Sequence, residues 1–234
     1  MLNAQITKSR RGFKVHAELQ LHLGDALALF GASGAGKSTI LACIAGIEDP
    51  DEGSVQFDGL RFFPPHLPLH QRPLGYLTQD PGLFPHLTVG ENVLFGVRDR
   101  AASPQETEWI ETLKQRLQLA PLWSAGAASI SGGQARRVGL ARMLARRPPL
   151  VLLDEPFAGL DRQSVRELID DLNLWRRSEG FSLIAVDHQA EVLERLCPEQ
   201  VMVMEAGRVV QRGSWEDLVT SPATPLLRSL LAPL

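Results

Sequence analysis

A lysine and a serine at the end of a glycine-rich run are the residues of this sequence that point most directly to a chemistry. Gly31 to Ser38 reads GASGAGKS, which fits the pattern G-x-x-x-x-G-K-[ST]. Glycines in such a loop let backbone N–H groups surround a phosphate, and a helix that begins there adds the positive end of its dipole. Lys37 would then reach the β- and γ-phosphates of a nucleotide, and the Ser38 hydroxyl would bind Mg²⁺. A glycine-rich turn without a function is the alternative interpretation.

Two adjacent carboxylates follow an apolar run at Leu150–Leu153. At the end of a strand, Asp154 could hold the water shell of Mg²⁺. Glu155 is the next residue and points elsewhere, which leaves it free to act on a water molecule. Acidic pairs are also common at ordinary strand ends, so this pair alone does not establish a site.

A Ser-Gly-Gly turn precedes an arginine-rich helix in the segment ISGGQ, Ile130 to Gln134. Such a turn at a helix N-terminus can bind an anion, and it can equally be a plain N-cap. For the arginines that follow, we favour a solvated helix face over a nucleic-acid surface. They are Arg136, Arg137, Arg142, Arg146 and Arg147.

Residues 2–30 are predicted to form β structure, and the glycine-rich run lies between the last strands of this segment and a predicted helix. Apolar residues alternate with polar ones from Phe13 to Leu23, which predicts a strand with one buried face. Ala26–Phe30 is apolar throughout, as expected of a fully buried strand. A helix is predicted over Lys37–Ala45, with Gly46 at its C-terminal end. A strand before the loop and a helix after it are the context in which such a loop binds phosphate.

The rest of the chain shows strand and helix signals, except that strand signals are scarce between residues 80 and 147. This scarcity predicts a separate helical region. Ser214-x-x-Asp217 resembles a capping box for a last helix, and the tail after Thr220 shows no clear pattern. The predicted strands are Ser54–Phe57, Leu74–Thr78, Leu150–Leu153 and Phe181–Val186, with a hairpin over Val201–Gly213. The other predicted helices cover residues 103–119, 134–147 and 163–179.

Composition narrows the class of protein. The chain has 234 residues, of which 44% are hydrophobic and 22% charged, so it can bury a core and is neither disordered nor fibrous. Its net charge of −3 argues against a dedicated nucleic-acid binder. Cys43 and Cys197 lie far apart in the sequence, which excludes a disulfide framework and a cysteine-based zinc site and fits a reducing compartment. No window approaches the ~18 consecutive apolar residues of a membrane span, and the N-terminus lacks a signal-peptide core.

The order of the motifs is more specific than any one of them. Along the chain come GASGAGKST, Gln79 at the end of a strand, SGGQ, LVLLDEP, AGLD (Ala158–Asp161) and His188 after a buried strand. This order resembles the nucleotide-binding subunit of ATP-binding cassette (ABC) transporters over residues 2–218. The resemblance implies an α/β fold, with a P-loop NTPase core, an N-terminal antiparallel β subdomain and an inserted α-helical signature subdomain. In this single domain, residues 1–79 and 148–220 would form the ATP-binding core, 80–147 the helical subdomain and 221–234 a tail.

The same resemblance implies a head-to-tail homodimer that holds two ATP molecules and Mg²⁺ between its subunits. Glu155 would be the general base, His188 would contact the γ-phosphate, Gln79 would sense metal and water, and Asp161 would tie the two sites together. The ATP-binding residues would be Gly31, Ala32, Ser33, Gly34, Ala35, Gly36, Lys37, Ser38 and Thr39. The signature residues that act on the other copy would be Ser131, Gly132, Gly133 and Gln134, and the metal ligands Ser38, Gln79 and Asp154.

Three positions fit the resemblance less closely than the motifs do. Phe13 is the one early aromatic that could stack on adenine, but its place in the apolar alternation makes a core residue an equal alternative. Ile130 stands where the family usually has leucine, and Asp187 where it usually has serine or threonine. Because an added carboxylate near a γ-phosphate is unfavourable, we expect Asp187 to point away.

Residues 67–93 are similar to ATPase subunits of binding-protein-dependent importers for molybdate, sulfate and thiamine-like solutes. The resemblance implies transmembrane permease subunits, a solute-binding protein and a peripheral place at the cytoplasmic face of the inner membrane; no nucleic acid is expected. The length leaves no room for the C-terminal regulatory domain of many oxyanion importers, which favours the short importers. An exporter subunit is the alternative. A soluble ABC ATPase fits less well, as does a small-molecule kinase, in which SGGQ and AGLD have no role.

The loop after Gln79 carries two large apolar side chains, Leu83 and Phe84. Loops seldom expose such groups without a partner. The two residues either close the joint between the helical region and the core or, as the resemblance implies, line a groove for a short helix of the membrane subunit.

Overall fold

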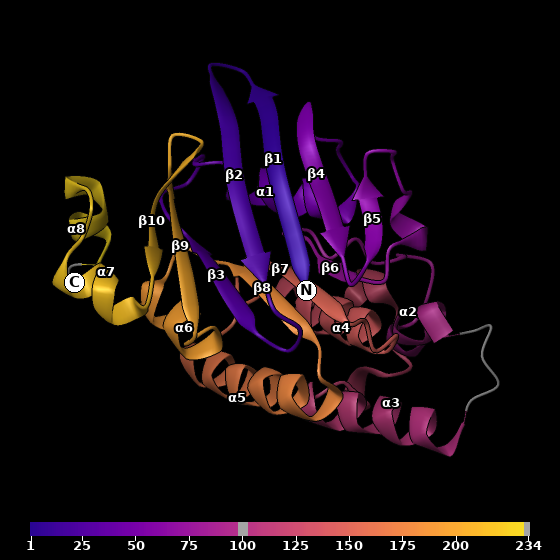
Figure 1. The fold of residues 1–234 in the computed structure, drawn as a ribbon. Helices are drawn as coiled ribbons and strands as arrows, with labels where there is room; N and C mark the ends of the chain where they lie inside the picture. Colours follow the sequence, from indigo (N-terminus) through magenta and orange to yellow (C-terminus); the bar gives the residue numbers. More distant parts are fainter. Residues whose placement is uncertain (98–102, 232–234) are drawn as a thin grey trace.

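The computed structural model describes residues 1–97 and 103–231, whose strands form one sheet (Figure 1). The strands lie side by side in the order β5-β4-β1-β2-β10-β9-β3-β8-β7-β6. Their bounds are β1 Leu2–Arg10, β2 Phe13–Leu21, β3 Ala26–Phe30, β4 Glu52–Phe57, β5 Leu60–Phe63, β6 Gly75–Leu77, β7 Leu150–Asp154, β8 Ser182–Val186, β9 Gln200–Glu205 and β10 Arg208–Gly213.

The sheet has two parts that meet at one residue pair. β5, β4, β1 and β2 pair antiparallel, whereas β9, β3, β8, β7 and β6 pair parallel. β10 forms a hairpin with β9 and joins β2 through the pair Arg208–His16. In Figure 1 the antiparallel strands rise above the parallel ones. The hairpin predicted over Val201–Gly213 is confirmed, and it connects the two parts of the sheet.

Strand β2 has one buried face, as its alternation predicts. Its odd-numbered residues from Val15 to Leu21 are buried and the even-numbered ones are exposed. The prediction that the strand runs to Leu23 is wrong: Leu23 is 53% exposed, because the chain turns at Gly24 with a φ of 82°. The buried face of the strand therefore ends two residues earlier than the apolar pattern does.

The described residues form eight α-helices, of which α1 follows the glycine-rich loop. It spans the predicted residues and ends at Gly46 (φ 82°), whose N–H donates to the carbonyls of Ala42 and Cys43. The bounds of the helices are α1 Lys37–Ala45, α2 Val89–Leu94, α3 Pro104–Arg116, α4 Gly132–Leu144, α5 Arg162–Glu179, α6 Ala190–Leu196, α7 Trp215–Thr220 and α8 Pro225–Leu231.

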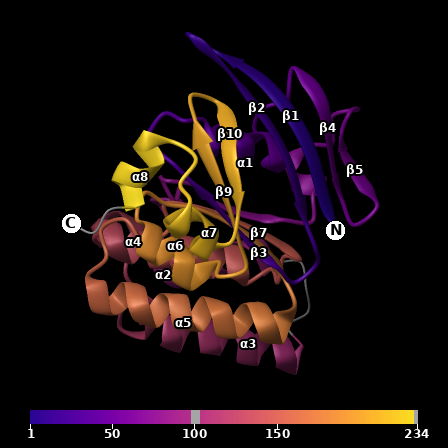
Figure 2. The ribbon, with the colours of Figure 1, turned by 60° about the vertical axis from the view of Figure 1, so that its left-hand side comes forward.

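Two hydrophobic clusters lie on opposite faces of the parallel strands. Side chains of β7 and β8 alternate between them, so that Leu152 and Ile184 enter one cluster while Leu153 and Leu183 enter the other. α1 fills the first cluster, between the parallel strands and the antiparallel part of the sheet. The longest helix, α5, lies with α3 on the opposite side (Figure 2). Burial on both faces explains why these strands are apolar throughout.

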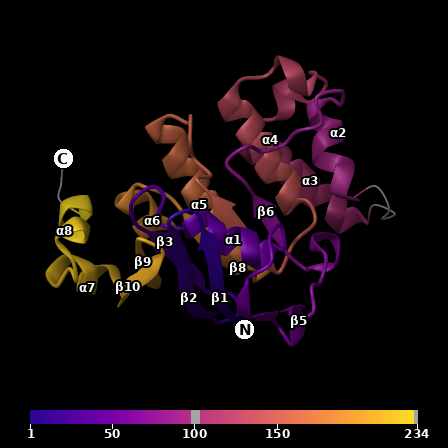
Figure 3. The ribbon, with the colours of Figure 1, turned by 90° about the horizontal axis from the view of Figure 1, so that it is seen from above.

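Residues 80–97 and 103–147 are called the helical region below. Its helices α2, α3 and α4 gather at one side of the molecule, and α7 and α8 lie at the other end (Figure 3). As predicted, these described residues contain no named strand. Within the ranges that the structure describes, no helix has the length and apolar character needed to cross a membrane. α8 lies in the tail that showed no clear pattern, and buried Leu227 anchors it.

Candidate functional site

Four neighbouring parallel strands end at the same edge of the sheet, and the candidate residues follow them. β3, β8, β7 and β6 lie side by side in that order. Because the carboxyl ends of parallel strands meet at one edge, the segments that follow these strands lie together. They are the loop Gly31–Thr39 after β3, Asp187 and His188 after β8, Asp154 and Glu155 at the end of β7, and Gln79 shortly after β6.

The glycine-rich loop requires glycine at its first position. A Cβ on Gly31 (φ 142°) would lie 2.2 Å from the carbonyl oxygen of Met204. Gly36 (φ 101°) is the N-cap of α1, and it offers no side-chain hydrogen bond to the first helical turn. Ser33 and Gly34 between them are exposed. The N–H groups at this helix end are therefore free of a side-chain cap and can bind an anion.

Lys37 lies folded onto the loop from which it projects. Its Nζ donates hydrogen bonds to the carbonyl oxygens of Gly31 and Ala32, at 2.8 Å each. The residue is only 8% exposed, and burial lowers the pKa of its ammonium group. The carboxylates of Glu155, Asp154 and Asp187 oppose that shift, so three acids act electrostatically on one cation.

Asp154 and Ser38 form the candidate metal site. The Ser38 hydroxyl donates to Asp154 Oδ1 at 3.1 Å, and the Tyr76 hydroxyl lies 3.4 Å from Asp154 Oδ2. Burial raises the pKa of Asp154, which is 3% exposed. Hydroxyl and carboxylate oxygens suit Mg²⁺, which takes its other ligands from water and phosphate. Gln79, the third predicted ligand, is exposed, and its side chain forms no hydrogen bond to another described residue.

Glu155 has an unusual backbone conformation. Its φ of 50° lies in the left-handed region, which costs a residue other than glycine about 1–3 kcal/mol. The surrounding structure holds it on both sides: its N–H donates to Val186 O at 2.9 Å, and its carbonyl accepts from Arg136 at 2.6 Å. The side chain is half-buried beside Asp154. The strain is thus located at the residue predicted to be the general base.

Asp187 and His188 follow β8. The Asp187 carboxylate is buried and accepts hydrogen bonds from the backbone N–H groups of His188 (2.8 Å) and Gln189 (3.0 Å). Burial raises its pKa. The carboxylate is thus turned toward the backbone of the residues that follow it. Its charge still raises the pKa of Lys37 electrostatically. His188 is exposed, with Nδ1 3.4 Å from Asp187 Oδ1.

The SGGQ turn forms the start of α4. Ser131 Oγ accepts from the N–H of Gln134 (3.3 Å), and Gln134 Oε1 accepts from the N–H of Ser131 (2.8 Å), which makes a capping box. A Cβ on Gly133 would lie 3.0 Å from Gly159 O, so this turn packs against the AGLD segment. Among the described residues, no hydrogen bond joins the turn to the loop 31–39 of the same chain.

Asp161 closes the AGLD segment as the N-cap of α5. Its carboxylate accepts from the backbone N–H groups of Gln163 and Ser164, at 3.0 Å each, and from Ser164 Oγ at 2.5 Å. The hydrogen bond from the Ser164 hydroxyl is the main cause of its lowered pKa. Within one copy the structure therefore gives Asp161 a capping role.

Phe13 lies beside the β9–β10 turn, and that turn is hydrogen-bonded to the glycine-rich loop. It is half-buried and packs against the cluster that contains α1, and a Cβ on Gly207 would lie 2.8 Å from its ring. The N–H of Gly207 donates to Ala35 O at 3.1 Å, which joins the β9–β10 turn to the loop. This position is compatible with a core residue and with a place beside a nucleotide base.

Three contacts of the site were not predicted from the sequence. Arg10 Nε donates to Thr39 Oγ1 at 3.1 Å, Tyr76 reaches Asp154, and Arg136 reaches the carbonyls of Glu155 and Gln79. Tyr76 is the only tyrosine of the chain and lies in a predicted strand, which was the one available signal. The interpretation of the α4 arginines as a solvated face is wrong for Arg136, Arg137 and Arg142, which are half-buried.

Comparisons with known proteins agree with the motif order. The ABC transporter family model matches residues 15–158. The sulfate/thiosulfate import ATP-binding protein CysA of Synechocystis is 36% identical over 91% of this chain and 59% of its own length. The molybdate/tungstate import ATP-binding protein WtpC of Pyrococcus abyssi is 38% identical over 83% of this chain and 56% of its own. The Fe(3+) ions import ATP-binding protein FbpC of Yersinia pestis is 37% identical over 93% and 63%.

This chain spans about three-fifths of the length of these relatives. A solved structure, the dimeric form of a bacterial ABC transporter cassette, matches 92% of this chain and 98% of its own length, with a TM-score of 0.81 and 25% identity. The predicted α/β cassette fold is therefore confirmed. The motif order, the cluster at the strand ends and the family match over more than half of the chain together show that this chain belongs to the ABC transporter family, as an ATP-binding cassette.

Proposed function

We propose that this chain hydrolyses ATP with Mg²⁺ in a head-to-tail homodimer and thereby drives solute import through membrane subunits. The main support for the proposal is the cluster of side chains that follow the parallel strands. There Lys37, Ser38 and Asp154 lie within hydrogen-bond and electrostatic reach of one another, and Glu155 is the next residue. These are the parts that phosphoryl transfer to water needs: a cation for the phosphates, metal ligands and a base.

Each side chain has a task in the proposed reaction. Lys37 Nζ would give up its hydrogen bonds to the loop carbonyls and bind the β- and γ-phosphates instead. Ser38 and Asp154 would hold Mg²⁺, which neutralises charge on the phosphate oxygens when bound. Glu155 would orient the attacking water and accept its proton, and exposed His188 would contact the γ-phosphate.

A second copy would complete the site. Ser131 and Gly132 are exposed at the start of α4, where the helix dipole and free N–H groups favour an anion. Because this turn forms no hydrogen bond to the loop 31–39 among the described residues, a phosphate bound to another copy is the proposed partner. The dimeric cassette that resembles this chain supports the arrangement.

The proposed contact with the membrane subunits is an apolar patch formed by Phe84, Leu94 and Phe95. Leu94 is 36% and Phe95 47% exposed, and the rings of Phe84 and Phe95 lie 4.4 Å apart. A patch of this kind suits a short helix that inserts a few apolar anchors. In this arrangement the chain would be bound peripherally at the cytoplasmic face of the inner membrane.

For the solute we propose an oxyanion, delivered by a solute-binding protein. Two relatives support this class, since they are named for import of sulfate or thiosulfate and of molybdate or tungstate. A third is named for Fe(3+) import, so the named solutes differ between relatives of similar identity. Stimulation of the ATPase by sulfate, molybdate or thiamine in membranes that contain the permease and the solute-binding protein would identify the solute.

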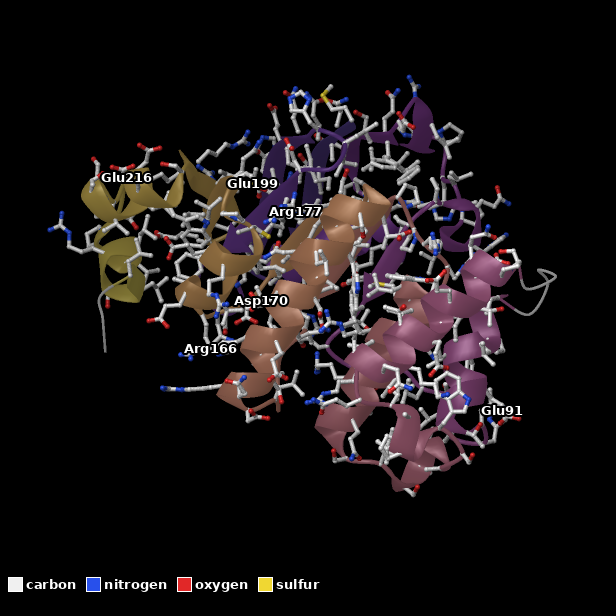
Figure 4. The ribbon with its side chains drawn as sticks, turned by 90° about the horizontal axis from the view of Figure 1, so that it is seen from below. Glu91, Arg166, Asp170, Arg177, Glu199 and Glu216 are labelled. Carbon is white, nitrogen blue, oxygen red and sulfur yellow. The ribbon has the colours of Figure 1, made fainter. Side chains whose placement is uncertain are left out.

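The test of the proposed reaction is Glu155→Gln. Because a positioned general base contributes roughly 10²- to 10⁴-fold, the variant should lose turnover by about that factor and keep its affinity for ATP. Glu216→Gln is the control, since Glu216 is an exposed glutamate on α7, at the far end of the molecule (Figure 4). If Glu155→Gln retains more than half of the unmodified hydrolysis rate, Glu155 is not the base.

A further inference from the structure

The arginines of α4 are not a uniform solvated face. Arg136, Arg137 and Arg142, in the first three turns, are half-buried, whereas Arg146 and Arg147 beyond the helix end are exposed. Arg137 donates to Ser164 Oγ at 2.8 Å, which links α4 to the start of α5. The half-buried arginines therefore connect α4 to other segments of the chain.

Arg136 connects α4 to two residues at the strand ends. Its Nη1 donates to the carbonyl of Glu155 at 2.6 Å, and its Nη2 donates to the carbonyl of Gln79. A guanidinium group can bind two acceptors at once because its N–H groups form a rigid planar fork. One side chain thus holds the backbone of the proposed base, in its left-handed conformation, and the backbone of the proposed metal-sensing residue.

The segment after Gln79 is also held by the helical region. Arg142 donates to Pro81 O (2.5 Å) and Gly82 O (3.0 Å). Asn92 of α2 binds the N–H and the carbonyl of Phe84, at 2.9 and 3.1 Å. Through these bonds the segment 79–84 is fixed to α4 and α2. The bond from Arg136 to Glu155 reaches from the same helix to the end of β7 in the parallel sheet.

We propose that Arg136 is a positioning residue that makes the placement of Glu155 depend on the position of α4. The inference rests on the proposed function. α4 begins at the SGGQ turn, and Arg136 lies in its first two turns. When that turn binds the nucleotide of a second copy, α4 is fixed, and the guanidinium holds the carbonyls of Glu155 and Gln79 in their reactive positions. Arg136 already makes both bonds within a single copy, and binding of the turn to the nucleotide of a second copy would restrain α4 and, through Arg136, the two carbonyls.

Substitution of Arg136 in the full-length chain tests the proposal. Arg136→Gln removes the charge and the fork, and Arg136→Lys keeps the charge and loses the fork. We expect kcat to fall by about tenfold or more in Arg136→Gln and by less in Arg136→Lys. A tenfold fall in kcat corresponds to ~1.4 kcal/mol of activation free energy. This is about the free energy that a hydrogen bond to a charged group contributes. The KM for ATP and the affinity for a fluorescent ATP analogue should stay within twofold.

Separate readouts distinguish positioning from general destabilisation. In the Glu155→Gln background, Arg136→Gln should still dimerise with Mg-ATP, because the SGGQ turn itself is intact. Arg177→Gln is the matched control, since Arg177 is exposed on the outer side of α5 (Figure 4). If Arg136→Gln lowers the melting temperature sharply, the Arg136→Lys variant decides the proposal. Its kcat must still fall without a change in KM.

Two results would overturn the proposal: kcat within twofold of the unmodified chain in both variants, or a fall in kcat accompanied by an equal loss of ATP affinity. The proposed function is judged by a different variant. If Glu155→Gln is inactive while both Arg136 variants are fully active, the role of Arg136 fails and the proposed hydrolysis stands. If Glu155→Gln itself remains active, Glu155 is not the base, whatever the Arg136 variants show.

Discussion

Around Lys37, burial acts against the charges that the proposed reaction needs. It lowers the pKa of the lysine and raises the pKa of Asp154. Such a cluster is unfavourable for the stability of the nucleotide-free chain. It becomes favourable when phosphates and Mg²⁺ supply the opposite charges, so these residue types serve the bound state rather than the fold.

Asp187→Asn should stabilise the nucleotide-free chain at neutral pH. The amide oxygen can still accept from the N–H groups of His188 and Gln189, while the buried charge is removed. The folded-state pKa of Asp187 is raised, so ionisation costs stability above that pKa and nothing below the unfolded value of about 3.9. The increase in melting temperature should therefore be largest at pH 7–8 and shrink as the pH falls toward about 4.

Asp170→Asn is the control for this pH series. Asp170 is an exposed carboxylate on α5, paired with Arg195 at 3.0 Å (Figure 4). Its removal should give no increase in melting temperature at neutral pH, because an exposed charge is solvated. A decrease in melting temperature for Asp187→Asn at pH 7 would show that the ionised carboxylate stabilises the turn.

At the level of single residues, sequence patterns located the groups that follow strands and missed the contacts between distant segments. Lys37, Ser38 and Asp154 were predicted because each belongs to a local pattern whose place relative to a strand is fixed. Tyr76 and Arg136 were not, because periodicity does not report which backbone or carboxylate a side chain reaches across the fold. The strain at Glu155 also has no signal in the residue types.

At the level of elements, local signals decided which predictions succeeded. β3 and α1 have their predicted bounds, because a fully apolar run and a C-terminal glycine define them. α2 was missed although Thr88 and Glu91 form the same capping box that marked α7. The missed elements are short: β5 has four residues, α2 six, α6 seven and α8 seven. Segments of one or two turns contain too few residues to show a period.

The loop from Gln79 to α2 yields a prediction about assembly with the membrane subunit. Phe84 is half-buried and lies against exposed Phe95, rather than deep in the joint between the helical region and the core. An apolar anchor of a helix-binding groove costs on the order of 2 kcal/mol when truncated. Phe84→Ala should weaken assembly at least tenfold, since ~1.4 kcal/mol is one decade. A pull-down with the membrane subunit measures this effect.

The isolated Phe84→Ala protein should keep its basal ATPase rate within about twofold, which is roughly 0.4 kcal/mol of barrier. Leu174→Ala is the matched control, because Leu174 is an apolar residue on α5 that is 52% exposed and lies outside the patch. It should leave assembly unchanged. If Phe84→Ala instead lowers the melting temperature sharply and assembles normally, Phe84 is a core residue and the membrane contact lies elsewhere.

At the level of the whole molecule, the proposed catalytic groups and the SGGQ turn lie on different parts of the chain. The former follow the parallel strands, and the latter begins α4 in the helical region. In the proposed arrangement, each copy therefore offers two incomplete halves of a nucleotide site. A head-to-tail pair would bring unlike halves together twice, and closed twofold pairing of this kind is the commonest symmetry of soluble oligomers.

Dimerisation should therefore depend on ATP and on the exposed glycine of that turn. Glu155→Gln should dimerise with Mg-ATP and remain monomeric with ADP, because in the proposed dimer only the γ-phosphate would reach the partner's turn. Adding Gly132→Asp should abolish the dimer, since its carboxylate would face that phosphate, and like charges at about 4 Å repel by ~4 kcal/mol near a protein surface. Gly126→Asp adds the same group at another exposed glycine with no atom within 4 Å of its Cβ, and should dimerise normally. Light scattering decides: a dimer in the Gly132→Asp protein, or none in Glu155→Gln with ATP, contradicts the model.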